Sequence, residues 1–154
     1  MWRAGVNIEL TPSLETDDDG ISAINPKSIP GATIDITVLA RNDGASATDN
    51  NSVEVVVPIP TQAELFVGDL DGLGNPVIFT DGTAPNQSGL TWLSPSTQIE
   101  YSNNGGISYT YTPPLAADFD DNVTHLKILP AGTFSGVGPS SIPEFTVAYR
   151  VRVK

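Results

Sequence analysis

The stretch WRAGVNIELT, residues 2–11, alternates apolar and polar side chains without a break. A period of two residues is typical of a β-strand with one buried face. The apolar positions are Trp2, Ala4, Val6, Ile8 and Leu10. We expect a strand over residues 4–11 that ends at Pro12, because proline cannot donate a hydrogen bond to a sheet. The segment is either the first strand of its own domain or an arm that completes a neighbouring subunit.

The same alternation returns along the rest of the chain. It is clearest in residues 34–41 and 145–153, and shorter runs follow it at 53–57, 63–67 and 123–129. Clusters of Gly, Pro, Asn and Asp separate these runs and predict turns. The pattern predicts an all-β, antiparallel sandwich of about nine or ten strands. Asn103–Gly106 lies between the runs 98–101 and 107–111, and predicts a hairpin there.

Length and composition agree with one such domain. The chain has 154 residues, with 14 Gly, 13 Pro and only 16% charged residues, which suits short strands joined by turns. We expect residues 1–12 to form an N-terminal strand with a donor role, and residues 13–154 to form the sandwich. The Asp-rich turn before Gly20 would be the hinge between the two.

The charge balance excludes two classes of partner. The net charge is −11, with seven basic residues, so no broad basic surface for nucleic acid or an anionic membrane can form. No apolar run approaches the length needed to cross a bilayer, and we expect no membrane span. Cysteine is absent, so the fold does not depend on the redox compartment.

Residues 29–44, IPGATIDITVLARNDG, resemble the conserved-repeat domain of bacterial surface proteins. In that family a Pro-Gly turn leads into an alternating strand that ends in Asn-x-Gly. The likeness extends over residues 28–67 and returns faintly at residues 145–153. It implies an immunoglobulin-like sandwich, an extracellular or cell-surface location, and a structural or adhesive role without catalytic residues. On the residues alone, we expect Asn42 and Gly44 to adopt the left-handed backbone of a tight reversal.

Two clusters of side chains are candidate binding sites. Calcium takes six to eight oxygen ligands, and an acidic turn at Asp118, Asp120 and Asp121 could supply some of them; the alternative is a solvated turn. No other cofactor is expected. Aromatic side chains gather in the middle of the chain, where they form either a glycan-binding face or packed cross-strand pairs. They are Trp92, Tyr101, Tyr109 and Tyr111.

Catalysis is not expected. His125 is the single histidine, and Asp121 lies four residues before it, but no Gly-x-Ser-x-Gly motif accompanies them. A lone imidazole on an alternating strand is more often a packed or exposed strand residue.

Assembly is the leading interpretation. Large apolar side chains left in water forgo roughly 1.5–3 kcal/mol each, so the N-terminal strand must be buried in its own chain or in another. Donation from copy to copy, head to tail, builds an open fibre. We therefore expect a non-enzymatic subunit of an extracellular filament or surface assembly. The alternative is a solitary secreted binding or adhesion module for a glycan or a protein.

Overall fold

The computed structural model describes residues 6–21, 27–93, 95–114 and 118–154, and this part of the chain is all-β. It contains eleven strands and one four-residue helical turn, α1. No helix in these ranges has the length and apolar character needed to cross a bilayer. The elements are β1 (Ile8–Asp18), β2 (Thr33–Asn42), β3 (Val55–Pro58), β4 (Ala63–Phe66), β5 (Val77–Asp81), β6 (Leu90–Thr91), α1 (Pro95–Gln98), β7 (Ile99–Ser102), β8 (Phe119–Asp120), β9 (His125–Ile128), β10 (Ala131–Gly132) and β11 (Glu144–Val153).

The larger sheet is built around the last strand. Its order is β1-β2-β11-β4-β8, and β5 also pairs with β11. β2 runs antiparallel along the whole length of β11, from Arg41 opposite Glu144 to Thr33 opposite Arg152. Both strands were predicted from their alternation, and both lie in the middle of the sheet.

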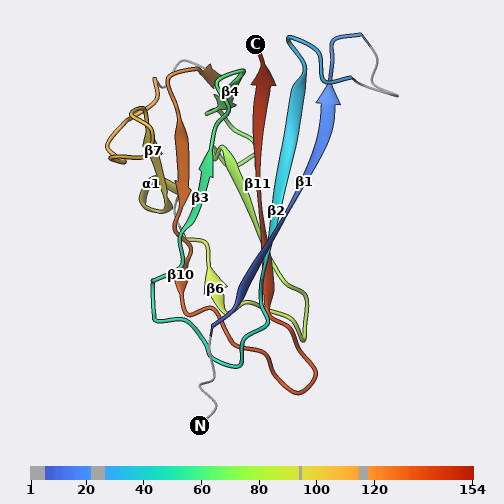
Figure 1. Cartoon of the computed structure of the whole chain (residues 1–154), viewed down its shortest axis with the longest axis vertical. Helices are drawn as coiled ribbons and strands as arrows, with labels where there is room; N and C mark the ends of the chain where they lie inside the picture. Colours follow the sequence, from blue (N-terminus) through green and yellow to red (C-terminus); the bar gives the residue numbers. More distant parts are fainter. Residues whose placement is uncertain (1–5, 22–26, 94, 115–117) are drawn as a thin grey trace.

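A three-stranded sheet, β3-β9-β7, forms the second layer. The two layers stand side by side in Figure 1, with β7 and β3 on one side and β11, β2 and β1 on the other. Alternate residues of both sheets meet in one core, for example Val147 and Val151 of β11 with Leu126 and Ile128 of β9. The predicted all-β antiparallel fold is confirmed. The immunoglobulin-like connectivity stays a prediction.

The N-terminal strand differs from its prediction. It runs from Ile8 to Asp18, so it passes through Pro12, and the expected boundary between residues 12 and 13 falls inside it. Proline is tolerated because β1 is an edge strand, with β2 as its one neighbour among the described strands. The register shifts between Thr16 and Asp18, next to the expected hinge.

Two turns differ from those that the sequence predicts. Residues 107–111 form no strand, and a single bridge joins Tyr111 to Tyr101 on the edge of β7 opposite to β9. The backbone amides of Gly106 and Ser108 donate instead to the side chains of Ser102 and Asn104. The second difference concerns Asn42 and Gly44, which do not have positive φ, although Gly31 does at +91°. Asn42 acts through its side chain instead. The buried Asn42 amide donates to the carbonyls of Ser46 and Ser135, and its oxygen accepts from the backbone of Asn7 and Gly44.

Candidate functional site

The inner face of β1 is the first feature with a functional consequence. β1 pairs with β2 so that Ile8 lies opposite Asn42, and Leu10 lies opposite Ala40. Directly paired residues point to the same side of a sheet, and Ala40 and Asn42 are buried in the core. The even-numbered residues of β1 therefore face the side on which the second sheet packs.

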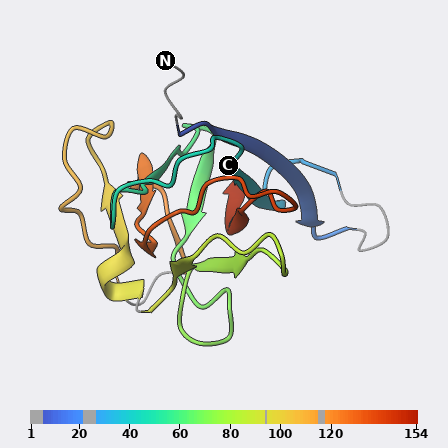
Figure 2. The ribbon, with the colours of Figure 1, turned by 90° about the horizontal axis from the view of Figure 1, so that it is seen from below.

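The second sheet does not extend over β1. In Figures 1 and 2, the second half of β1 lies beyond β2, away from β7 and α1, whereas in the view of Figure 1 its first residues cross β2 and β11. The apolar side chains on its inner face are consequently left in solvent: Val6, just ahead of β1, is 45% exposed, Ile8 41%, Leu10 53% and Leu14 68%. A contiguous exposed apolar stripe of this kind is typical of an interaction surface.

An open groove of about 250 Å³ lies where this stripe meets the second sheet. Ile8 and Leu10 line it from β1, Val55 lines it from β3, and Val53 lines it from the segment just ahead of β3. Among the strands that the structure describes, β3 pairs only with β9, so its outer edge presents unpaired backbone groups. The groove is an apolar slot beside a free strand edge, and we call it the open groove.

The open groove has a distinct charge pattern. Its inner wall carries no charged side chain, and Glu54 stands exposed at its rim. Val53 and Val55 are buried while Glu54 faces outward, as expected for successive residues of an extended segment. The groove thus offers apolar contacts inside and one carboxylate outside.

The opposite face of β1 is polar and held by an ion-pair network. Arg150 of β11 pairs with Asp35 of β2 at 2.6 Å and reaches Asp17 of β1 at 3.0 Å. The hydrogen bond to Asp35 raises the pKa of Arg150, and burial opposes this rise. The network connects the three neighbouring strands β11, β2 and β1. It favours the register in which the polar face of β1 points away from the core.

The predicted donor residues are only partly within the described chain. Trp2 and Ala4 lie outside it, Val6 precedes β1, and Ile8 and Leu10 belong to β1 and pair with β2 of the same chain. In the single chain, therefore, residues 8–18 complete their own sheet. Donation to a neighbour by the residues ahead of them stays a prediction.

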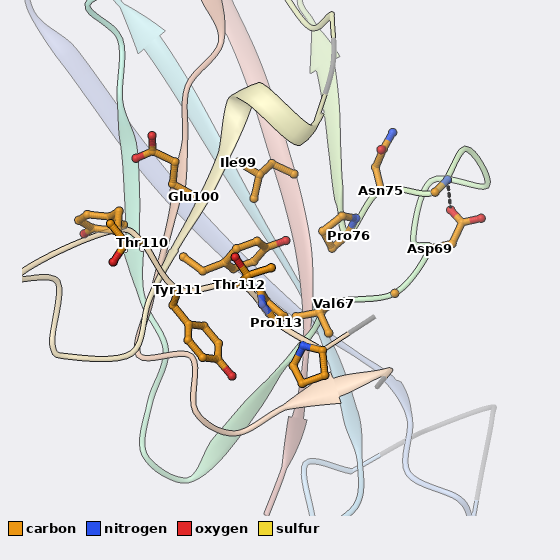
Figure 3. A pocket seen from close by; sticks show the side chains of 15 residues that line it. Val67, Asp69, Asn75, Pro76, Ile99, Glu100, Thr110, Tyr111, Thr112 and Pro113 are labelled. Carbon is orange, nitrogen blue, oxygen red and sulfur yellow. Dashed lines mark hydrogen bonds between the residues drawn. The ribbon is translucent and has the colours of Figure 1, made fainter. Parts of the chain in front are cut away.

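A second feature is a cleft of about 820 Å³ beside β7, at the edge of the three-stranded sheet opposite to β3. Figure 3 shows Ile99, Tyr111, Pro76 and Val67 around it, from separate segments of the chain. Three of the four predicted aromatic residues line it, namely Tyr101, Tyr109 and Tyr111. We call it the tyrosine cleft.

Contacts with neighbouring side chains position the rings of Tyr111 and Tyr109. The Tyr111 hydroxyl donates to Asp120 at 2.8 Å, and this hydrogen bond raises the pKa of Tyr111. The ammonium of Lys127 lies 3.9 Å from the centroid of the Tyr109 ring and 3.4 Å from Glu100. Burial raises the pKa of Tyr101 to about 12.

The fourth aromatic residue is elsewhere. Trp92 is stacked on Phe79 with ring centroids 5.7 Å apart and planes 9° apart, and it packs against the core. The grouping of Trp92 with the three tyrosines is therefore wrong. Trp92 lies apart from the three tyrosines because it follows β6, whereas the tyrosines belong to β7 and the loop after it.

The predicted acidic site is not assembled. Asp120 is buried and accepts from Tyr111 and Asn122, Asp121 lies 4.0 Å from Lys154, and the Asp118 carbonyl accepts from the backbone of Val67. Within the described ranges no three His, Asp or Glu side chains are grouped to hold a metal ion. The hydrogen-bond partner of the His125 ring is Thr124, rather than Asp121.

Comparison with family models, with curated proteins and with solved structures gave no match. The resemblance of residues 28–67 to the conserved-repeat domain therefore stays a prediction.

Proposed function

We propose that the protein is a non-enzymatic structural subunit of an extracellular assembly, joined head to tail through its N-terminal segment. The observation that carries this proposal is the open groove, where Ile8 and Leu10 stay 41% and 53% exposed beside the buried Val53 and Val55. An extended segment laid along the free edge of β3 would cover the lining and pair the backbone groups at the same time.

The residues ahead of β1 have the alternating sequence that such a segment requires. Trp2, Ala4 and Val6 alternate with polar or small residues, so in an extended conformation they share one face. Set beside β3, this face would point toward Val53 and Val55. The intervening Arg3 would then point outward, on the same side as Glu54.

Charge favours a second copy as the source of this segment. With a net charge of −11, two copies repel each other over most of their surfaces. The first seven residues, however, contain Arg3 and no acidic residue, and the groove rim carries Glu54. Because donor and acceptor are different surfaces, repeated donation leads to an open fibre.

The extracellular location and the structural role are supported by the resemblance of residues 28–67 to surface-protein repeats. The non-enzymatic character is supported by the separation of His125 from Asp121, whose partners are Thr124 and Lys154.

A charge-exchange experiment tests the proposed contact between the N-terminal segment of one copy and the open groove of the next. Glu54→Arg and Arg3→Glu should each weaken association by at least about tenfold, because like charges would then face each other. The double variant should restore it. Asp121→Arg makes the same charge change next to β8, at the opposite edge of the larger sheet from β1, and should leave association unchanged. Sedimentation velocity measures the association, and electron microscopy shows whether fibres form.

A wild-type protein that stays monomeric at every concentration would contradict the proposal, since the N-terminal segment would then fill its own groove or none. Failure of the double variant to associate better than either single variant would also contradict it.

A solitary secreted binding module is the second candidate. It is favoured by one observation, the convergence of Tyr101, Tyr109 and Tyr111 on a single cleft. A monomeric wild type that binds a ligand in that cleft would support it over the assembly.

A further inference from the structure

The tyrosine cleft has the size and lining of a small-molecule site. Its volume of about 820 Å³ lies within the range of roughly 300–1,000 Å³ found for such sites. Besides the tyrosines, it is lined by the rings of Pro76, Pro113 and Pro114. Proline rings lose little conformational freedom when a ligand binds, and the same holds for Tyr111 and Tyr109, which already contact Asp120 and Lys127. The walls of the cleft are therefore largely preformed.

Polar groups without protein partners line the same space. The hydroxyl of Tyr101 makes no hydrogen bond to any residue that the structure describes, and this side chain is half-buried. The hydroxyls of Thr110 and Thr112 have no partner in the described part of the chain either. These groups can both donate and accept, so they suit a ligand rich in hydroxyls.

Charge restricts the ligand further. Asp69 and Glu100 line the cleft, and Lys127 is engaged by Glu100 and the Tyr109 ring. In a chain with a net charge of −11, an anionic ligand would be repelled. Carboxylates at the rim instead accept hydrogen bonds from neutral hydroxyls.

We propose that the tyrosine cleft binds a neutral saccharide chain. A pyranose ring has an apolar C–H face, which stacks on the negative face of an aromatic ring, and a rim of hydroxyls for the polar groups. Tyr101 and Tyr111 supply the stacking surfaces, and the Tyr101, Thr110 and Thr112 hydroxyls supply the hydrogen bonds. The site is independent of the open groove, because β7 and β3 are opposite edges of their sheet.

The test uses the full chain and soluble neutral oligosaccharides of glucose and N-acetylglucosamine at millimolar concentrations. NMR titration should shift the resonances of residues 99–112 and leave those of β1 and β2 in place. Tyr101→Phe keeps the ring and removes the hydroxyl, so binding should weaken about tenfold, the effect of one lost hydrogen bond. Tyr149→Phe makes the same change in the core of the other sheet and should bind like the wild type.

Three results would overturn the proposal: no shift with any neutral oligosaccharide, equal binding by Tyr101→Phe and the wild type, or stronger binding of an acidic polymer such as polygalacturonate. A proline-rich peptide that displaces the oligosaccharides and binds more tightly would assign the cleft to peptides instead. None of these outcomes depends on whether the protein forms fibres.

Discussion

The side chain of Asn42 illustrates what one buried polar residue does in this fold. It lies at the end of β2, fully buried, and its amide joins the start of β1, the following turn and the segment at Ser135. A buried amide whose hydrogen-bond partners are in place lowers the stability of the fold little, whereas one left unpaired lowers it by about 1–3 kcal/mol. Asn42 therefore holds Asn7, and with it the start of β1, beside the open groove.

At the same scale, Tyr149 predicts a response to alkaline pH. Burial raises its pKa to about 12, whereas the unfolded chain ionises near pH 10. The folded state holds the proton more tightly, so the resulting stability is complete below pH 10 and is lost as the pH rises toward 12. Tyr149→Phe removes this titration.

Urea unfolding at a series of pH values measures the effect. Between pH 10 and 12 the free energy of unfolding of the wild type should fall by about 1–2 kcal/mol more than that of Tyr149→Phe. Tyr101 titrates in the same range in both proteins, so it cancels in the difference. Parallel curves for the two proteins would show that Tyr149 does not carry this dependence.

Among the elements, β1 is held differently from all its neighbours in the larger sheet. Its side chains are exposed or half-buried, so its place depends on the backbone ladder with β2 and on the ion pair from Asp17 to Arg150. Central strands such as β11 are fixed by burial instead. A strand held mainly by exposed backbone hydrogen bonds opens more readily than the core.

We therefore expect Asp17→Asn to loosen β1 selectively. An exposed ion pair contributes about 0–1 kcal/mol, so the loss of global stability should be of that size. Hydrogen exchange of the β1 amides should accelerate, while that of β11 should change only with global stability. Glu9→Gln removes a charge from the same face of β1 that forms no ion pair with a described residue, and it should leave the exchange of β1 unchanged. Equal acceleration in both variants would contradict the role of Asp17.

For the whole molecule, the decisive property is a large negative charge combined with an uncharged inner face on β1. Repulsion between copies opposes association at every surface, while contact at the open groove favours it. The net effect depends on how far the charges act. The Debye length falls from about 30 Å at 0.01 M salt to about 10 Å at 0.1 M.

Wild-type association should therefore strengthen as salt rises over this range, since the net repulsion is screened more than the apolar contacts are. Leu10→Lys places a charge in the groove and should associate weakly at both salt concentrations. Thr11→Lys, on the opposite face of the same strand, is the matched control and should follow the wild type. Sedimentation equilibrium provides the comparison, and association that weakens with added salt would contradict this account.

Local sequence patterns predicted some elements closely. The alternations at 34–41 and 145–153 became β2 and β11, because strand periodicity depends on neighbours two residues apart. The hairpin at residues 103–106 was wrong in its second arm, because the backbone amides of Gly106 and Ser108 donate to the side chains of Ser102 and Asn104 and not to the backbone of β7. Three members of the tyrosine cleft were predicted as a group and Trp92 was misplaced, since the group meets only through the packing of separate segments.

By itself, the sequence determined the all-β class, the alternating faces of the strands and the negative charge, since these follow from local spacing and composition. Only the tertiary structure decided that β1 continues through Pro12, that the smaller sheet stops short of it, and that three tyrosines share a cleft. The physical reason is that the extent of a sheet and the closure of a cleft depend on pairing between residues far apart in the chain, and no local pattern records those partners.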